Sequence, residues 1–413
     1  MSKKDLLNLQ AQVVNSTVEI SCYLSNSIFT TQSTRDAPLQ IRLLRREANE
    51  FTFNHDYAEY FDGLDTDGAE VIFEDTVKLI NHRKIVYTDN TVKNGATYVY
   101  WVSLPGGAPT GPVAVRVRDE KLWWPNNKIE RRMQTLAEMY PRKVQIREFG
   151  KTIQGRSIRG LVVGNPKKMI AFIGAIHPGE SGPELIVPAI ERILQEHPEM
   201  VEQIGVAILP SVCIDQREKM VQGNPWYLRK NYNEVDLNRN FPAEWENIEY
   251  TYGLITSDPD AATYRGPAPC SEPETRAVIS FIEESKPLCV FSYHCLAGIC
   301  GPSFLTSKSA VGDAAFKEQS HQFATPFQQG FYGNSEKETN LKFACTAGSL
   351  TSWLYQEYNI PGFDLEWEGE EKSKISHTDN VTPELMAEYQ DRHYQALLQV
   401  LREMSDESTF TYH

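Results

Sequence analysis

Two residues near the middle of the chain, His177 and Glu180, have the chemistry and spacing of metal ligands. They lie in the stretch MIAFIGAIHPGESGPEL, which begins at Met169. An imidazole nitrogen and a carboxylate oxygen are both good zinc ligands, and two such side chains from one short turn can reach the same ion. The pair would equally fit a surface histidine followed by a glutamate at a helix start, where the helix dipole favours a negative charge. H-x-x-E spacing therefore needs support from the rest of the chain.

That support comes from two polar residues that follow apolar segments later in the sequence. His294 comes directly after LCVFSY, and Glu366 comes directly after FDL. Because ligands gather at the carboxyl ends of strands in open α/β sheets, we expect these two side chains to lie near His177 and Glu180. Two histidines and one glutamate leave an open position for water, as in catalytic zinc sites. A further carboxylate is then needed to take the proton of that water.

Each of these residues also has a structural interpretation. His294 could be a histidine at the edge of the core, and Glu366 could be a solvated strand end. Arg229, which precedes the string DLNRNFP, and Arg239, which lies within it, could belong to structural ion pairs. A metal site is favoured, because in its absence all of these structural interpretations would have to be true at once.

The segments that must position these residues alternate between strands and helices after residue 121. Ser271 to Glu274 has the pattern of a capping box, and Thr382 with Pro383 has that of an N-cap and first helical position. The apolar patterns predict strands at 144–149, 158–163, 169–176, 206–209 and 288–293, and helices at 129–139, 184–196, 271–284 and 382–404. This order predicts an α/β domain over 121–413, with a mixed, mostly parallel sheet flanked by helices.

Residues 1–120 predict a smaller all-β sandwich domain instead. Apolar and polar residues alternate at 17–24 and 96–104, between glycine and proline turns. Short strands at this spacing are typical of a β-sandwich. The stretch TYVYWVSLPGGAPTGPVAVRVRD resembles the closing strands of a fibronectin type III or immunoglobulin-like module. No catalytic constellation lies there, so we expect an accessory packing or docking module.

Composition excludes several classes of partner. The 413 residues carry a formal net charge of −14, which argues against nucleic acid or an anionic membrane. No apolar run approaches the length of a membrane span, and the first residues lack the apolar core of a signal peptide. The 7 cysteines are scattered and odd in number, which favours a reducing compartment over a disulfide framework. We therefore expect a cytoplasmic protein, whose oligomeric state the sequence leaves open.

Over roughly residues 125–405 the chain resembles the M14 family of zinc carboxypeptidases. The matching pieces, in order, are GKTIQGRSIRGLVV, HPGE, LRKNYNEVDLNRNFP, YRGPAPCSEPETRAV, SYH and AGSLTSWLYQEYNIPGFDLEW. The strings DLNRNFP and SEPETR are most similar to bacterial members, including those resembling murein tripeptide amidases. The resemblance implies one zinc ion per chain, with His177, Glu180 and His294 as ligands and Glu366 as general base and then acid.

The same resemblance implies how a substrate is held. Arg229 would polarise the scissile carbonyl and stabilise the oxyanion, while Asn238 and Arg239 would hold the terminal carboxylate. A guanidinium fork has the right shape for a bidentate carboxylate contact. The expected partner is therefore a peptide or peptide-like substrate with a free C-terminal carboxylate. Peptides derived from murein belong to this class.

The sequence departs from the family pattern at two places. CIDQ, from Cys213 to Gln216, stands where many members have Asn-Pro-Asp-Gly. Phe343 stands where the family has a substrate-capping tyrosine, which makes Tyr332 and Tyr355 displaced candidates for substrate contact. Leu350 is expected near the side-chain pocket, and the acidic segment 368–371 could favour substrates that carry an amine.

Two other functions remain open at this stage. A zinc deacylase similar to aspartoacylase and succinylglutamate desuccinylase would share H-x-x-E, DLNR and the distal histidine, although SEPETR and the Gly348 turn favour the peptidase branch. A non-catalytic binding protein on the same scaffold would not need the three zinc ligands and the base that are all present. Metal content and hydrolysis of a peptide panel would separate these alternatives.

Overall fold

The computed structural model describes residues 6–26, 28, 38–48, 63–81, 83–248, 250–251, 253–294, 302–333, 338–367 and 381–406. The chain divides into two compact units. The first comprises Met1–Glu120 together with Lys219–Tyr227, and the second comprises Lys121–Glu218 together with Leu228–His413. The place of Lys219–Tyr227 in the first unit has no counterpart in the sequence-based division at residue 120.

The first unit contains two antiparallel sheets that share one core. One sheet has the order β1-β2-β5 and the other β4-β3-β6-β7. The strands are β1 (Leu6–Val14), β2 (Thr17–Leu24), β3 (Leu39–Ala48), β4 (Glu70–Val77), β5 (Lys84–Asp89), β6 (Thr97–Ser103) and β7 (Thr110–Arg116). Alternate residues of β2, among them Val18 and Ile20, pack in one cluster with Tyr98 and Tyr100 of β6. Period-two alternation thus places one face of each sheet in the core.

Backbone hydrogen bonds explain why a segment from later in the chain belongs to this unit. The N–H of Val13 donates to the carbonyl of Gln222 at 2.8 Å, and the N–H of Arg116 donates to the carbonyl of Gly223 at 2.8 Å. The inserted segment therefore satisfies polar groups of β1 and β7, which are edge strands of the two sheets. No apolar periodicity marks such a contact, so the sequence pattern did not predict it.

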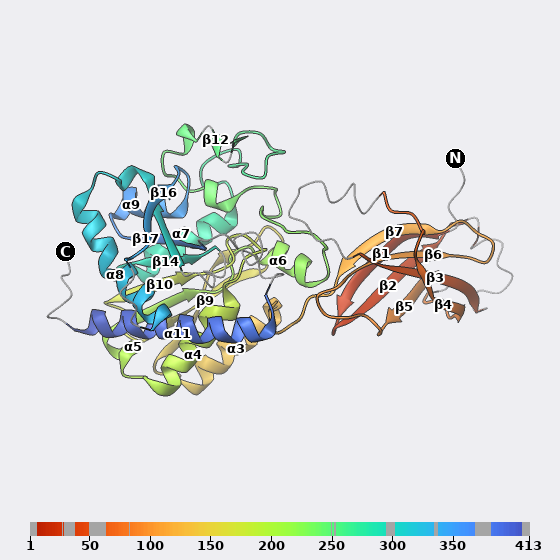
Figure 1. Ribbon diagram of the computed structural model, residues 1–413, viewed down its shortest axis with the longest axis horizontal. Coiled ribbons are helices and arrows are strands. Elements are labelled where there is room, and N and C mark those ends of the chain that lie inside the picture. Colours follow the sequence, from red (N-terminus) through yellow and green to blue (C-terminus); the bar gives the residue numbers. More distant parts are fainter. Residues whose placement is uncertain are drawn as a thin grey trace. The chain divides into compact units, whose positions relative to one another are not determined.

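The second unit is built on a mixed sheet of eight strands in the order β16-β15-β17-β14-β10-β11-β9-β8 (Figure 1). The central strands β17, β14, β10 and β11 run parallel to one another. The strands are β8 (Val144–Lys151), β9 (Ser157–Val163), β10 (Met169–Ile173), β11 (Gly205–Leu209), β14 (Val290–Tyr293), β15 (Pro302–Ser307), β16 (Leu341–Cys345) and β17 (Gly362–Trp367). This arrangement confirms the predicted mixed, mostly parallel sheet.

Helices cover both faces of this sheet. On one face Ile173 of β10 packs in a cluster with Phe281 of α7 and Leu354 of α9. On the other face Phe291 of β14 stacks on Phe327 of α8 with ring centroids 4.9 Å apart. Figure 1 shows α4, α5 and α11 side by side along one edge of this unit. The helices are α3 (Asn126–Met139), α4 (Pro183–Glu196), α5 (Met200–Gln203), α6 (Ile214–Val221), α7 (Pro273–Ser285), α8 (Ala314–Tyr332), α9 (Leu350–Tyr358) and α11 (Pro383–Ser405).

The two predicted helix starts have different outcomes. Thr382 is the N-cap of α11 and its side chain accepts from the N–H of Leu385, as predicted. The predicted capping box at Ser271 is wrong, because α7 begins at Pro273 and its N-cap, Glu272, makes no side-chain cap hydrogen bond. Glu274 is instead buried and accepts from Nδ2 of Asn231 at 3.1 Å. Tertiary packing therefore takes the glutamate that the local motif would have used.

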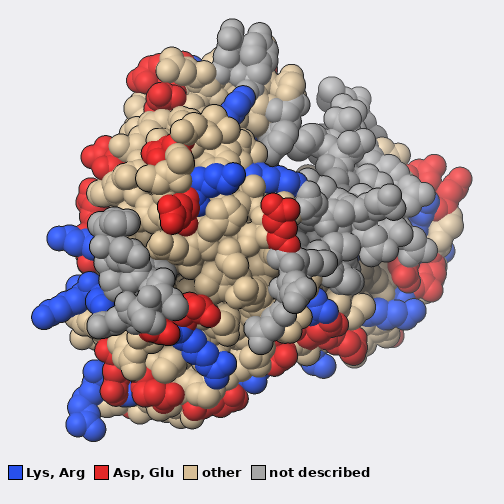
Figure 2. Space-filling view, turned by 60° about the vertical axis from the view of Figure 1, so that its left-hand side comes forward, with Lys and Arg blue, Asp and Glu red and all other residues tan. Residues whose placement is uncertain are grey.

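On the face shown in Figure 2, acidic and basic side chains of the described residues are interspersed. No helix in the described ranges is both long enough and apolar enough to cross a membrane.

Candidate metal centre

Neighbouring strands of the parallel part of the sheet carry the candidate ligands. β10 ends at Ile173 and leads into the loop that holds His177 and Glu180, whereas His294 follows β14 directly. These two strands are hydrogen-bonded neighbours, so their carboxyl ends meet at one edge of the sheet. The loop after β10 folds back on itself tightly, because a Cβ added to Gly174 would lie 2.6 Å from Cα of Gly182. Glycine at both positions permits this approach and brings the first two ligands to the strand end.

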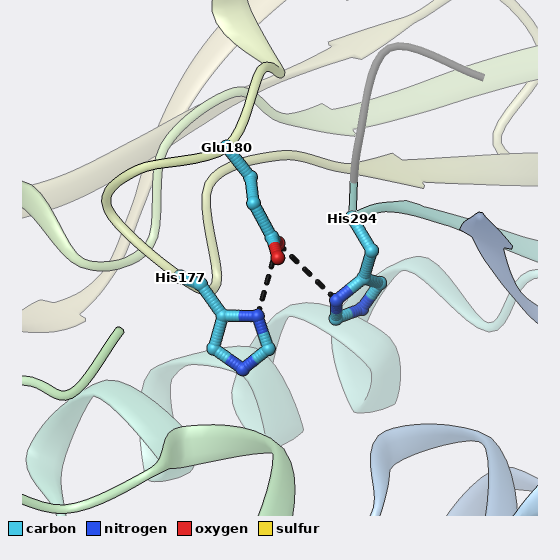
Figure 3. A group of neighbouring side chains, drawn as sticks. All are labelled: His177, Glu180 and His294. Atoms are coloured by element: carbon cyan, nitrogen blue, oxygen red, sulfur yellow. Dashed lines mark hydrogen bonds and ion pairs between the residues drawn. The ribbon is translucent and has the colours of Figure 1, made fainter. Parts of the chain in front are cut away.

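The three ligand side chains converge on one point. Nδ1 of His177 lies 3.0 Å from Oε2 of Glu180, and Nδ1 of His294 lies 3.3 Å from the same oxygen (Figure 3). One ligand atom from each residue falls within 4.8 Å of the other two, and all three side chains are buried. Two imidazole nitrogens and one carboxylate oxygen in this arrangement fit a zinc ion. The structure thus brings together the three residues that the sequence predicted as ligands.

The Nε2 atom of each histidine contacts a carboxylate that was not predicted from the sequence. Nε2 of His177 lies 3.0 Å from Oδ1 of Asp236, and Nε2 of His294 lies 3.1 Å from Oδ1 of Asp364. The hydroxyl of Ser292 also lies 3.1 Å from Nε2 of His294. Partners of this kind fix the orientation of a ligating ring and leave its other nitrogen for the metal. Both rings therefore present Nδ1 to the centre.

Strong electrostatic coupling follows from burying these groups together. Burial acts to raise the pKa of Glu180, but the adjacent His177 and His294 rings lower this pKa to about 2. Burial likewise acts to raise the pKa of Asp236, and Arg229, Arg239 and His177 hold it well below its usual range. Both carboxylates are therefore charged at neutral pH, which suits residues that bind or orient ligands of a cation.

Glu366 lies on β17, two residues after Asp364 and on the same face of that strand. Burial and the nearby carboxylates of Glu180 and Asp364 raise the pKa of Glu366, against the opposing effect of His294 and Arg229. A raised carboxyl pKa moves the group towards the range in which it can both accept and return a proton. Acidic residues at positions i and i+2 of an otherwise apolar strand were the available signal for Asp364, but only the second of them, Glu366, was predicted as a site residue.

The DLNRN segment forms a capped turn that holds the polar residues expected to bind substrate. Asp236 is the N-cap of the 3₁₀ turn η1 (Leu237–Arg239), and its side chain accepts from the N–H of Asn238. The other oxygen of Asp236 accepts from Nε of Arg229 at 2.9 Å. Nη1 of Arg239 donates to the carbonyl of Asn238 at 2.6 Å. One buried carboxylate thus connects His177 with both arginine-bearing segments.

Two other residues predicted to contact substrate have packing roles. The side chain of Leu350 is fully buried in the core cluster beside Trp353 and Leu354, and only its backbone N–H contacts the site, donating to Oδ1 of Asn238 at 2.9 Å. Tyr355 donates its hydroxyl to Asp313 at 3.2 Å and packs edge-on against Phe316 of α8. A side-chain pocket near Leu350 and a substrate contact by Tyr355 stay predictions.

Other departures from the family pattern can be placed in part. Cys213 is buried in the same core cluster, and Phe343 is half-buried on β16. Tyr332, at the end of α8, packs edge-on against Phe331 with ring centroids 5.4 Å apart. The acidic segment 368–371 lies outside the described residues.

An α/β sheet with a His–Glu–His centre at its strand ends defines a protein with a candidate mononuclear metal site. Residues 129–388 match the profile of a family described as zinc carboxypeptidase. This match covers more than half of the chain, and the chain belongs to the zinc carboxypeptidase family.

Individual relatives agree with this assignment. Human carboxypeptidase O is 30% identical over 277 residues, which cover 60% of this chain and 71% of the relative. Murein peptide amidase A of Escherichia coli (strain K12) is 43% identical over 70 residues, which cover 16% of this chain and 29% of the relative. For mouse carboxypeptidase M the match is 29% identical over 135 residues and covers 29% of this chain and 30% of that protein. The chain therefore spans less than a third of two of these relatives.

A solved structure shows the same fold. Carboxypeptidase A from Helicoverpa armigera superposes with a TM-score of 0.57 and 16% sequence identity, covering 71% of this chain and 76% of that chain. At this identity the likeness concerns the fold alone.

Proposed function

We propose that the chain is a zinc-dependent metallocarboxypeptidase that hydrolyses the C-terminal amide bond of a peptide or peptide-like substrate. The observation that carries the proposal is the convergence of His177, Glu180 and His294, whose ligand atoms lie within 4.8 Å of one another. These three residues would hold the metal, and membership of the family supports zinc as that metal. Zinc, when bound, polarises a carbonyl and lowers the pKa of a bound water to about 7.

Protein groups around the centre supply the remaining chemistry. Glu366, with its raised pKa, would accept the proton of the attacking water and then deliver it to the leaving amine. Arg229 would donate to the carbonyl oxygen as negative charge develops there. Asn238 and Arg239 would bind the terminal carboxylate of the substrate, and this contact selects the last peptide bond of the chain.

A matched pair of peptides tests the proposal. One peptide has a free C-terminal carboxylate and the other is amidated, and both are assayed with the wild type and with Arg239→Ala. We expect the wild type to prefer the free carboxylate and Arg239→Ala to lose that preference mainly through KM. Arg192→Ala is the control, because it removes an arginine from surface ion pairs with Glu196 and Asp391 and should keep the preference.

Other outcomes would point to other functions. Equal cleavage of both peptides by the wild type would contradict the carboxylate-binding role and the exopeptidase proposal. Cleavage of N-acyl amino acids with no cleavage of peptides would favour the zinc deacylase alternative. Stoichiometric zinc without hydrolysis of any substrate would favour a binding protein.

The similarity to murein peptide amidase A supports a finer proposal about the substrate. The 70-residue segment that is 43% identical is the strongest identity among these matches, so we propose murein-derived peptides as one substrate class. Comparing a murein peptide that ends in a diamino acid with a peptide that ends in an apolar residue tests this. A higher kcat/KM for the apolar peptide would contradict it. A cytoplasmic location stays a prediction from the sequence.

A further inference from the structure

Asp364 lies between a candidate zinc ligand and a residue proposed to bind the substrate carboxylate. Its Oδ1 is 3.1 Å from Nε2 of His294, and its Oδ2 accepts from Nδ2 of Asn238 at 2.9 Å. We propose that Asp364 is a positioning residue that couples metal binding at His294 to recognition of the substrate carboxylate at Asn238. This inference rests on the proposed function and adds a residue that neither the sequence motifs nor the comparisons assign.

The surroundings of Asp364 fix its carboxylate. The residue is 5% exposed and lies on β17 between its two partners. Its Oδ2 also accepts from Sγ of Cys345 at 3.4 Å. Because the two oxygens have partners on different elements, rotation of the carboxylate would break the contact with His294 or the one with Asn238. A buried carboxylate without these partners would be costly, so the arrangement favours keeping both contacts.

The contact with Asp364 also determines which way the amide of Asn238 points. Oδ1 of Asn238 accepts from the N–H of Leu350 at 2.9 Å, while its Nδ2 donates to Asp364. A flipped amide would place a donor against the N–H of Leu350 and an acceptor against the carboxylate. An amide group has two N–H donors, so one of them serves Asp364 and the other would donate to a substrate oxygen under the proposed function.

The carboxylates of Asp236 and Asp364 make the same kinds of contact. Asp236 contacts His177 and Arg229, and Asp364 contacts His294 and Asn238. Each of the two candidate histidine ligands is thus linked through one buried carboxylate to one residue that would contact substrate. A substitution of the substrate-contacting residue should therefore affect metal binding at the linked histidine through the carboxylate between them.

Zinc affinity and carboxylate preference together test the coupling. Apparent zinc Kd is measured by competition with a chromophoric chelator, and preference is the ratio of kcat/KM for the free and amidated peptides. We expect Asp364→Asn to raise the zinc Kd by ~10–100-fold, as for partners of other metal ligands, and to lower the preference as well. Asn238→Ala should raise the zinc Kd by about threefold or more, although it contacts no zinc ligand, because Asp364 loses a hydrogen bond that holds it.

Ser292→Ala is the matched control. It removes the other partner of Nε2 of His294 and leaves the link to Asn238 intact. It should weaken zinc binding and leave the ratio for the two peptides unchanged. In the variant that combines Asp364→Asn with Asn238→Ala, the two effects on zinc Kd should be less than multiplicative, because both break the same link.

Specific results would overturn the coupling. A wild-type zinc Kd in Asn238→Ala would do so, as would fully multiplicative effects in the combined variant. If Asp364→Asn does not fold, the zinc Kd of Asn238→Ala decides the question alone. A wild type without preference for the free carboxylate would contradict the proposed function, while the zinc measurements would still decide whether Asn238 and His294 are coupled.

Discussion

Nε2 of His177 lies 3.0 Å from Oδ1 of Asp236, a carboxylate that is fully buried. The same carboxylate accepts from Arg229 and caps the turn that carries Asn238 and Arg239. It therefore orients a candidate metal ligand and at the same time holds the segment that would bind substrate.

Asp236→Asn should weaken zinc binding. An asparagine has about the same volume but no negative charge to hold the imidazole, so we expect the zinc Kd to rise by ~10–100-fold. Chelator competition measures this change. Asp215→Asn is the control, because Asp215 is a buried aspartate that contacts Thr152 and Arg156, so its loss should affect stability and not zinc affinity. Equal zinc Kd values in wild type and Asp236→Asn would contradict the assigned role.

Arg229→Ala and Arg239→Ala should fail in different kinetic parameters. Arg229 would contact an oxygen that gains charge in the transition state, so its loss should lower kcat by about 10²-fold. Arg239 would contact a carboxylate that does not react, so its loss should raise KM with a smaller effect on kcat. Steady-state kinetics with the free-carboxylate peptide measures both. The same pattern in the two variants would show that their roles are not distinct.

Arg217→Met should destabilise the second unit. Arg217 is buried, ion-pairs with the buried carboxylate of Glu184, and donates to the carbonyl of Glu180 at 2.6 Å. Removing the guanidinium leaves Glu184 as a buried charge without that partner, at a cost of about 3–5 kcal/mol in the free energy of unfolding. Urea denaturation measures the loss. Adding Glu184→Gln to Arg217→Met should recover part of it, and a loss below about 1 kcal/mol for the single variant would refute the prediction.

His393 should make the protein sensitive to mild acid. Burial lowers the pKa of His393 to about 3, and its ring packs beside Tyr293, Phe327 and Phe331. Since an unfolded histidine has a pKa of about 6.5, the unfolded chain binds more protons between these values. The contribution of His393 to stability is therefore fully present above pH ~6.5 and is lost as pH falls towards 3, by up to about 1.4 kcal/mol per pH unit.

Urea denaturation at pH 7 and pH 5 tests this dependence in wild type and in His393→Gln. The variant should lose less stability than the wild type between the two pH values. His197→Gln, at the surface end of α4, is the control and should keep the acid sensitivity of the wild type. An unchanged pH dependence in His393→Gln would show that other groups cause the acid sensitivity.

Sequence patterns predicted the parts of this protein that depend on ligand chemistry and strand periodicity. The expectation that His177, Glu180 and His294 lie close together agrees with the structure, because the strand ends of a parallel sheet meet at one edge. The side-chain directions of Leu350 and Tyr355 were not predictable, because they depend on packing: Leu350 points into the core and Tyr355 towards α8. These contacts are tertiary, and no local pattern encodes them.

Two other features could not be predicted from local sequence patterns, because they also depend on tertiary contacts. Glu274 has the spacing of a capping box, yet it accepts from Asn231, a residue 43 positions away in the sequence. Insertion of 219–227 into the first unit depends on backbone hydrogen bonds, which carry no side-chain signature. The carboxylate partners of the histidines were partly predictable, because Asp236 and Asp364 lie within or beside segments that the sequence motifs had already identified.

A metal held by His177, Glu180 and His294 should act together with Glu366 in hydrolysis. The turnover of Glu366→Gln loaded with one equivalent of zinc tests this, assayed on the free-carboxylate peptide beside the zinc-loaded wild type. Glutamine keeps the size of the side chain and cannot accept the proton, so kcat should fall by at least ~10²-fold while zinc content stays the same. Near-normal turnover with full zinc content would contradict the claim.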